Sequence, residues 1–226
     1  MMREIKFEGR KIIFDERDEA DRSIAAEIFK FREYRIAENV IRQAKIIIDV
    51  GAHIGLFSLY CHAINPLAKI FALEPEPNNI KRLTKTLALN TVLSAKILPV
   101  ALAGKTGKGR LILTPDSHNH YLGTADALEE GIIVKTLTLS ALKKQEKLKQ
   151  IDLLKMDIEG GEYDIFENLS ATDYLGIKYI ILEYHEDKER RRKDLEKILR
   201  ENGFGVQVFP SQFDKTMGFV FANNKR

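Results

Sequence analysis

The sequence predicts an α/β domain built on a doubly wound, mostly parallel sheet of seven strands whose final strand is antiparallel. The clearest observation is the β-branched run at residues 46–50, which is followed by Gly51. An apolar run without polar alternation is typical of a strand buried on both faces of a parallel sheet. A second observation is that similar runs, at residues 69–73, 151–156 and 178–185, are separated by amphipathic helical stretches. A third is that these later runs end in or beside acidic side chains.

Length and composition favour one intracellular domain. We expect a single domain over residues 1–226, in which 1–44 form an N-terminal hairpin and helical cap and 45–226 form the core. With 36 Lys and Arg against 33 Asp and Glu, the net charge of +3 does not favour a nucleic-acid or membrane partner. The single cysteine, Cys61, excludes an intramolecular disulfide. No apolar run approaches the roughly 18 residues of a membrane span, so we predict a cytoplasmic protein.

The N-terminal cap is expected to combine a hairpin with one or two helices. Residues 2–16 carry apolar side chains on both sides of a glycine turn, as a short hairpin does. Residues 18–44 show apolar positions at helical spacing, which predicts packing onto the core. An alternative for this segment is that Phe31, Glu33 or Tyr34 closes over a bound ligand.

The turn after the first core strand predicts a ligand site. Asp49, Gly51 and Gly55 form an Asp-x-Gly-x-x-x-Gly pattern before an apolar helix, and the missing Cβ atoms let a ligand lie against the backbone. The pattern lacks the middle glycine of the Gly-x-Gly-x-x-Gly fingerprint that cradles a pyrophosphate, which disfavours an NAD-dependent oxidoreductase. It resembles instead motif I of class I S-adenosylmethionine-dependent methyltransferases. That resemblance implies a cationic, phosphate-free cofactor whose amino end faces Asp49.

The next two strands are predicted to supply further contacts with the ligand. The strand at residues 69–73 ends at Glu74, whose carboxylate is placed to accept both hydroxyls of a ribose, as an acid about 20 residues on does in dinucleotide sites. The alternative is that Glu74 complements the dipole of the helix expected at residues 77–90. The strand at residues 95–100 ends at Val100 and Ala101, which would lie under an adenine ring in this fold, although small apolar residues are equally expected there for packing.

A polar insertion at residues 114–131 lies between two strand-like runs, at 110–113 and 132–136. His118 and His120 form a His-x-His pair in it, but the sequence offers no third well-spaced ligand, which disfavours a metal site. We therefore expect a solvated loop, or a mobile cover over the substrate.

Two later strands bring chemically active side chains to the same edge. The strand at residues 151–156 runs into Asp157 and Glu159, which should face the glycine turn because ligands bind outside the carboxyl ends of strands at a switch point. In the following strand, Glu183 and His185 alternate and so share a face, where a histidine can accept a proton from a hydroxyl. The alternatives are helix capping by either acid and a purely structural role for the histidine.

The remaining stretches complete the sheet. A lysine-rich helix is expected over residues 139–149 and a charged helix over 188–201, whose basic run at 190–193 is expected to face solvent. The segments 206–209 and 216–222 are predicted to form the closing pair of strands.

Four motifs together resemble the FkbM family of methyltransferases, over about residues 35–185. The resemblance implies a Rossmann-like class I methyltransferase fold and O-methylation of hydroxyls, often on sugars or polyketide-type acceptors. His53 and Gly161 stand where the family usually has Asn and Ala. The motifs lie at residues 48–55, 72–77, 153–162 and 181–185. The cofactor-binding residues expected at these strand ends are Asp49, Gly51, Ala52, His53, Gly55, Glu74, Ala101 and Asp157.

The expected reaction is methyl transfer from S-adenosyl-L-methionine to a hydroxyl of a small molecule, sugar or glycoconjugate. His185 is the expected base, Glu183 orients it, and Asp157 or Glu159 holds the acceptor or a divalent ion. Such an ion would be Mg²⁺, although nothing in the sequence requires a metal. Two alternatives are an RNA or protein methyltransferase, suggested by the basic residues 188–200, and a non-catalytic domain that binds the cofactor.

Overall fold

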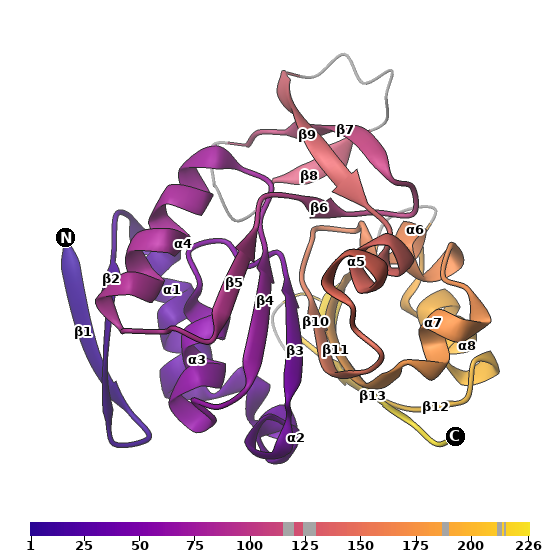
Figure 1. The fold of residues 1–226 in the computed structure, drawn as a ribbon, viewed down its shortest axis with the longest axis horizontal. Helices are drawn as coiled ribbons and strands as arrows, with labels where there is room; N and C mark the ends of the chain where they lie inside the picture. Colours follow the sequence, from indigo (N-terminus) through magenta and orange to yellow (C-terminus); the bar gives the residue numbers. More distant parts are fainter. Residues whose placement is uncertain (115–119, 124–129, 187–189, 212–213, 215) are drawn as a thin grey trace.

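The computed structural model of the protein describes residues 1–226 apart from 115–119, 124–129, 187–189, 212–213 and 215 (Figure 1). The strands are β1 (Met2–Phe7), β2 (Arg10–Asp15), β3 (Ile46–Val50), β4 (Lys69–Leu73), β5 (Ala95–Leu98), β6 (Ala101–Leu102), β7 (Gly107–Ile112), β8 (Tyr121–Gly123), β9 (Gly131–Leu137), β10 (Ile151–Met156), β11 (Ile177–His185), β12 (Phe204–Pro210) and β13 (Met217–Asn224). The α-helices are α1 (Glu19–Ala25), α2 (Glu38–Gln43), α3 (Leu56–Ile64), α4 (Pro77–Leu89), α5 (Leu139–Glu146), α6 (Glu162–Glu167), α7 (Ala171–Leu175) and α8 (Arg192–Glu201), and two short helices of other types are η1 (Ala26–Phe31) and η2 (Glu33–Ala37).

The central sheet has the predicted seven strands, in the order β12-β13-β11-β10-β3-β4-β5. Strands β3, β4, β5, β10 and β11 run parallel, and β13 is antiparallel to both of its neighbours. The chain leaves β3 in one direction, through β4 and β5, and returns to the other side of β3 with β10 and β11. The switch point of the sheet therefore lies between β3 and β10. The prediction of a doubly wound sheet with an antiparallel last strand is confirmed.

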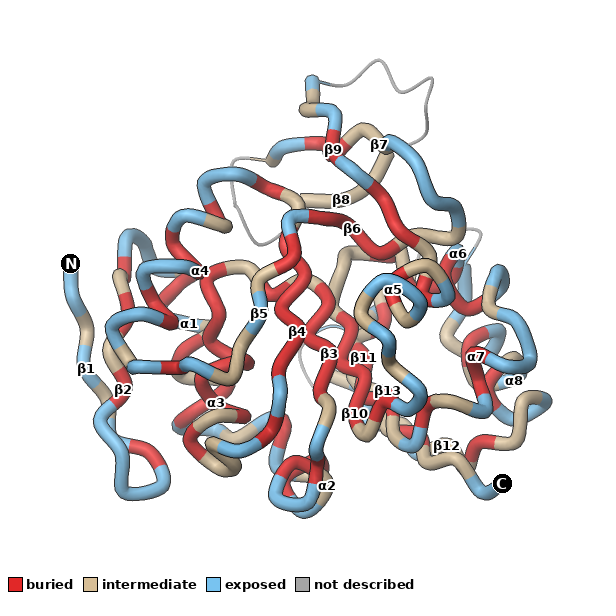
Figure 2. Tube along the Cα trace, in the orientation of Figure 1, coloured by how far each residue is buried: buried red, intermediate tan, exposed pale blue. Residues whose placement is uncertain are grey.

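Both faces of the sheet are covered, which gives three layers. Ile47 packs into an apolar core on the face covered by α2, α3 and α4, whereas Ile48 packs into a second core on the face covered by α5, α6 and α8. Both isoleucines are fully buried, as the absence of polar alternation in this run predicts. Figure 2 shows the middle strands as a continuous buried band with exposed segments around it.

The N-terminal cap contains the predicted hairpin, since β1 and β2 pair antiparallel around Glu8 and Gly9. Asn90, just beyond α4, holds the hairpin to the core: its Oδ1 accepts from the Ile13 amide at 2.8 Å and its Nδ2 donates to the Ile13 carbonyl at 2.6 Å. The region predicted as one or two helices is divided into four short ones. Arg32, with a left-handed φ of 56°, ends η1 and begins η2, which explains one of these interruptions.

A second, four-stranded sheet in the order β6-β9-β7-β8 lies next to the carboxyl edge of β5 (Figure 1). Strands β7 and β9 correspond to the two strand-like runs expected around the insertion, and they pair antiparallel. The insertion is not only a loop, because it contributes β8, which pairs with β7. His118 lies outside the described residues. None of the described helices has both the length and the apolar character needed to cross a bilayer.

Candidate functional site

A cavity of about 280 Å³ opens at the carboxyl ends of β3, β4, β10 and β11. This is the edge of the sheet, on both sides of the switch point, at which parallel sheets bind ligands. Its walls come from three parts of the chain: the turns that follow these strands, the N-terminal segment of α1, η1 and η2, and the second sheet. Of the expected site residues, the cavity is lined by Gly51, Ala52, His53, Glu74, Ala101, Asp157, Glu159, Glu183 and His185.

The two glycines of the first turn are required by close packing within the protein. Gly51 has a φ of +74°, and a Cβ there would lie 2.0 Å from the carbonyl oxygen of Asp157. Gly55 has a φ of +90°, and its Cβ would lie 2.6 Å from Cδ1 of Leu83 in α4. The missing side chains therefore allow β3 to approach β10 and α4, whereas we expected them to admit a ligand. Gly51 still lines the cavity, but Gly55 is not among its lining residues.

Asp49 lies behind the cavity wall, where it holds a lysine. Its carboxylate is completely buried, accepts from Ser58 Oγ at 2.7 Å and lies 3.4 Å from Nζ of Lys155. Lys155 in turn lies 3.7 Å from Asp157 and donates to the Gly51 carbonyl at 3.1 Å. Burial opposes the charge of this lysine, but the carboxylates of Asp49 and Asp157 raise its pKa above the ordinary value. Lys155 lines the cavity and Asp49 does not, so the contact between Asp49 and the cofactor stays a prediction.

Lys155 is a site residue that the sequence interpretation missed. It is 3% exposed and lines the cavity. The signal was present, because Lys155 is a lone cation near the end of a buried strand, and a buried lysine requires an acidic partner. The acid expected to touch the ligand, Asp49, is that partner.

Glu74 lines the cavity at the end of β4 and is 5% exposed. Its two carboxylate oxygens accept from the backbone amides of His53 and Glu76, each at 2.9 Å. Burial raises the pKa of Glu74 to about 7, although these amides and Asn79 act against the shift. The helix-capping alternative applies to Glu76, which accepts from the Asn79 amide at 2.6 Å at the start of α4.

The apolar part of the cavity lies beyond β5. Val100, Ala101 and Leu102 line it from one side, and Leu111 and Leu122 line it from the second sheet. Val100 and Ala101 are 4% and 7% exposed. Because both are apolar and line the cavity, an apolar ring bound there would be removed from water. Ala101 thus lines the cavity, and its contact with an adenine ring stays a prediction.

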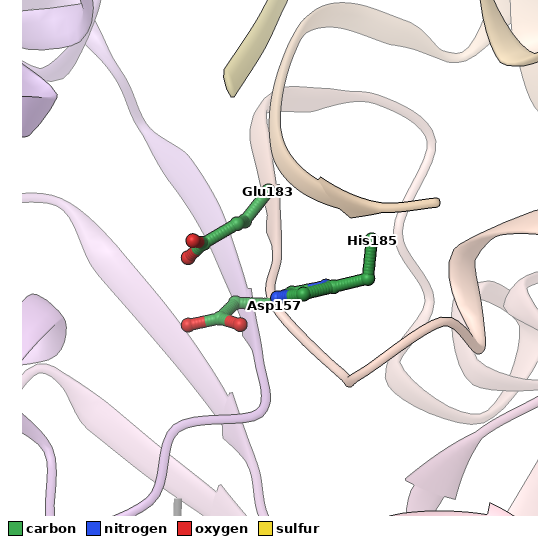
Figure 3. Close-up of side chains that lie close together, drawn as sticks. All are labelled: Asp157, Glu183 and His185. Carbon is green, nitrogen blue, oxygen red and sulfur yellow. The ribbon is translucent and has the colours of Figure 1, made fainter. Parts of the chain in front are cut away.

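Asp157, Glu183 and His185 lie together at the opposite part of the cavity (Figure 3). One ligand atom from each lies within 4.8 Å of those of the other two. Burial, together with Asp157, Glu33 and Glu159, raises the pKa of Glu183 to about 9. Burial lowers the pKa of His185, which favours a neutral imidazole. The prediction that these strand-end side chains lie close together is confirmed.

The carboxylate that pairs with His185 is Glu159, whose Oε2 lies 3.6 Å from Nε2 of the histidine. The orienting role was expected of Glu183. Glu159 follows β10 with a left-handed φ of 55°, and His53 follows β3 with a φ of 47°. Such a conformation costs a non-glycine residue about 1–2 kcal/mol, and strained residues of this kind cluster at functional sites.

The N-terminal segment contributes part of the wall. Glu33 and Tyr34 line the cavity, as one interpretation of residues 18–44 expected, whereas Phe31 is 67% exposed. Tyr34 is buried and packs edge-to-face against Phe57 of α3. His120 also lines the cavity from the insertion.

A family model described as the methyltransferase FkbM domain matches residues 49–206. The chain belongs to the FkbM family of methyltransferases. Its predicted membership is thereby confirmed, and methyl transfer is the reaction that this membership establishes.

Three relatives of this FkbM-family protein are similar over most of their length. The methyltransferase sdnD of Sordaria araneosa is 30% identical over 81% of this chain and 82% of its own. The hexuronic acid methyltransferase AglP of Haloferax volcanii is 26% identical over 80% and 75%. The 31-O-demethyl-FK506 methyltransferase FkbM of Streptomyces tacrolimicus is 24% identical over 80% of both chains.

Solved structures support the fold alone. The fibrillarin pre-rRNA processing protein of Methanococcus jannaschii superposes with a TM-score of 0.54 at 15% identity, over 99% of this chain and 82% of that one. An rRNA methylase from Streptococcus thermophilus gives a TM-score of 0.54 at 9% identity, over 86% of this chain and 98% of that one. These matches confirm the class I methyltransferase fold of the FkbM-family protein.

Proposed function

We propose that this protein transfers a methyl group from S-adenosyl-L-methionine to a hydroxyl oxygen of a small molecule, sugar or glycoconjugate. The observation that supports this most is the order of chemical groups along one cavity. An apolar surface at Val100 and Ala101 is followed by the buried carboxylate of Glu74 and then by the cluster of Asp157, Glu183 and His185.

The residues present fit this cofactor. Val100 and Ala101 would contact the adenine, Glu74 would accept from the ribose hydroxyls, and Asp157 would face the cationic amino-acid end beside Gly51. When bound, the cofactor supplies an electrophilic methyl group on a positively charged sulfur. The protein contributes orientation and exclusion of water, which are the main sources of rate enhancement for such a transfer.

His185 is the proposed proton acceptor for the hydroxyl of the acceptor molecule. A neutral imidazole has an unprotonated ring nitrogen, and burial of this histidine favours that form. Glu159, at 3.6 Å, would stabilise the positive charge once the imidazole is protonated. Glu183 would hold the acceptor by a hydrogen bond.

The names of two relatives support a small-molecule or sugar acceptor, since one is a hexuronic acid methyltransferase and another a 31-O-demethyl-FK506 methyltransferase. The basic segment that suggested RNA gives less support. Arg190 donates to the Gly160 carbonyl at 2.6 Å, and Arg192 pairs with Glu196 at 3.2 Å. These two arginines are therefore engaged within the chain. The cytoplasm remains the proposed location.

Binding and turnover together test the proposal. Calorimetry should show that S-adenosylhomocysteine binds the protein, and that Glu74→Ala weakens binding at least tenfold, whereas Glu76→Gln, which alters a neighbouring cap, does not. A panel of hydroxylated acceptors should accept labelled methyl groups, and His185→Ala should lower kcat by about 100-fold with little change in affinity for S-adenosylhomocysteine. The absence of any association with the cofactor or its product would refute the proposal.

A further inference from the structure

We propose that Asp157, Glu183 and His185 form a binding site for one divalent transition-metal ion, of the Mn²⁺ type, that contacts the acceptor. This inference rests on the proposed function, because it assigns a role to the acceptor part of the same cavity. It replaces the role of His185 as a free base with that of a metal ligand.

The spacing of the three side chains fits one ion. Their ligand atoms all lie within 4.8 Å of one another. Two donors bound to the same ion at about 2.2 Å can be at most about 4.4 Å apart. Side-chain adjustments of a few tenths of an ångström therefore bring all three donors into the first coordination sphere.

The positions of these residues also suit a catalytic ion. Asp157 directly follows β10, while Glu183 and His185 lie at the end of β11, which pairs with β10 in parallel. Figure 3 shows the three side chains lying close together. All three line the cavity. Three protein ligands with the remaining coordination positions open to a cavity are the arrangement of catalytic rather than structural metal sites.

The carboxyl groups in this part of the cavity favour the binding of a cation. Among the described residues that line the cavity, Lys155 is the only lysine or arginine, and it is shared between the buried Asp49 and Asp157. Glu159 and Glu183 add two further carboxyl groups to the same wall. Carboxyl groups held this close repel one another when ionised, and a bound divalent ion removes that repulsion.

The ligand types indicate the kind of ion. Two carboxylates favour hard ions such as Mg²⁺ and Mn²⁺, whereas an imidazole favours first-row transition metals. Mn²⁺ satisfies both preferences. Nδ1 of His185 is buried and has no hydrogen-bond partner among the described residues. An ion at this point would polarise the acceptor hydroxyl and lower its pKa.

The test is metal binding by the full-length protein after chelator treatment, without cofactor or acceptor. Electron paramagnetic resonance should show one bound Mn²⁺ per chain, with ¹⁴N coupling from an imidazole. His185→Gln should abolish that coupling, and His185→Gln, Glu183→Gln and Asp157→Asn should each weaken binding at least tenfold. The matched control is His120→Gln, which changes a histidine of the same cavity outside the trio and should leave Mn²⁺ binding unchanged.

Three results would overturn the site: no Mn²⁺ bound at millimolar concentration, Mn²⁺ bound without nitrogen coupling, or unchanged affinity in two of the trio variants that retain the wild-type unfolding midpoint. Calorimetry with S-adenosylhomocysteine on the same metal-free protein separates this inference from the proposed function. Normal binding of S-adenosylhomocysteine without Mn²⁺ binding rejects only the metal site. Loss of S-adenosylhomocysteine binding from the folded, metal-free protein and from the Mn²⁺-loaded protein rejects the proposed function.

Discussion

The ammonium group of Lys155 lies 3.4 Å from the carboxylate of Asp49, and both side chains are buried. The pair joins β10 to β3, directly beneath the cavity. Removing one partner of a buried pair leaves an uncompensated charge, which typically costs about 3–5 kcal/mol.

Lys155→Met should therefore lower the free energy of unfolding by about 3–5 kcal/mol. The control is Lys178→Met, which breaks a 2.6 Å pair with Asp152 between neighbouring strands of the same sheet. Lys178 is 46% exposed, so its loss should cost at most about 1 kcal/mol. Urea denaturation of both variants checks the contrast. Similar losses in the two variants would contradict the structural role of the Lys155 pair.

Gly51→Ala should prevent correct folding or lower stability by at least about 3 kcal/mol, because the new Cβ would lie 2.0 Å from the Asp157 carbonyl oxygen. Gly9→Ala is the matched control: its φ of +72° is almost the same as that of Gly51, but a Cβ there meets nothing within 4 Å. It should show only the backbone strain of about 1–2 kcal/mol. Thermal and urea unfolding measure both, and equal losses would mean that the strands do not approach this closely.

Glu162→Gln should change how stability depends on pH. The side chain is buried, accepts from the Ile158 amide at 2.9 Å, and burial raises its pKa to about 7 from an ordinary value of 4.5. Because the folded-state pKa is the higher one, the stability contributed by the protonated form is complete below pH 4.5 and is lost as pH rises through 7. The loss amounts to up to about 3 kcal/mol.

In Glu162→Gln this loss should disappear, so the difference in unfolding free energy between variant and wild type should grow in favour of the variant from pH 4.5 to pH 7.5. Urea titrations at several pH values measure it. Glu201→Gln, at an exposed position on α8, should leave the wild-type profile unchanged. A pH profile of Glu162→Gln parallel to the wild-type one would contradict the raised pKa.

Asn90→Ala should loosen the N-terminal hairpin. The side chain exchanges two hydrogen bonds with the backbone of Ile13 and donates to the Thr86 carbonyl, so its removal should cost about 1–3 kcal/mol. Asn202 also follows a helix, but its side chain donates to the Ile198 carbonyl of the same helix at 2.9 Å. Asn202→Ala should therefore leave hydrogen exchange of the β2 amides unchanged, while Asn90→Ala should accelerate it. Unchanged exchange in both would mean that Asn90 does not hold the hairpin to the core.

The sequence was sufficient for the middle of the central sheet because β3, β4 and β10 are buried on both faces, and a run such as residues 46–50 has few other interpretations. It also placed Glu74, Asp157, Glu183 and His185 at one edge, since the carboxyl ends of parallel strands meet there. The inward position of Asp49 was not predictable in this way. It depends on pairing with Lys155, a contact between residues far apart in the chain.

The second sheet and the N-terminal segment show where local patterns fail. Strand β8 has three residues and exists because β7 offers it a partner, which no pattern within the insertion reveals. The breaks among α1, η1, η2 and α2 follow from turns such as Arg32, whose positive φ is unusual for an arginine. Apolar spacing indicated a helical segment but not its interruptions.

The N-terminal wall of the cavity is separate in the chain from the turns at Gly51 and Glu74. Ile24, Ile28, Glu33 and Tyr34 border the cavity, yet all precede residues 49–206, which the family model matches. Substitutions at these positions can therefore reshape this wall without changing the turns at Gly51 and Glu74. Exchanging residues 18–44 with those of a relative that modifies a different molecule would test whether this wall selects the molecule that is methylated.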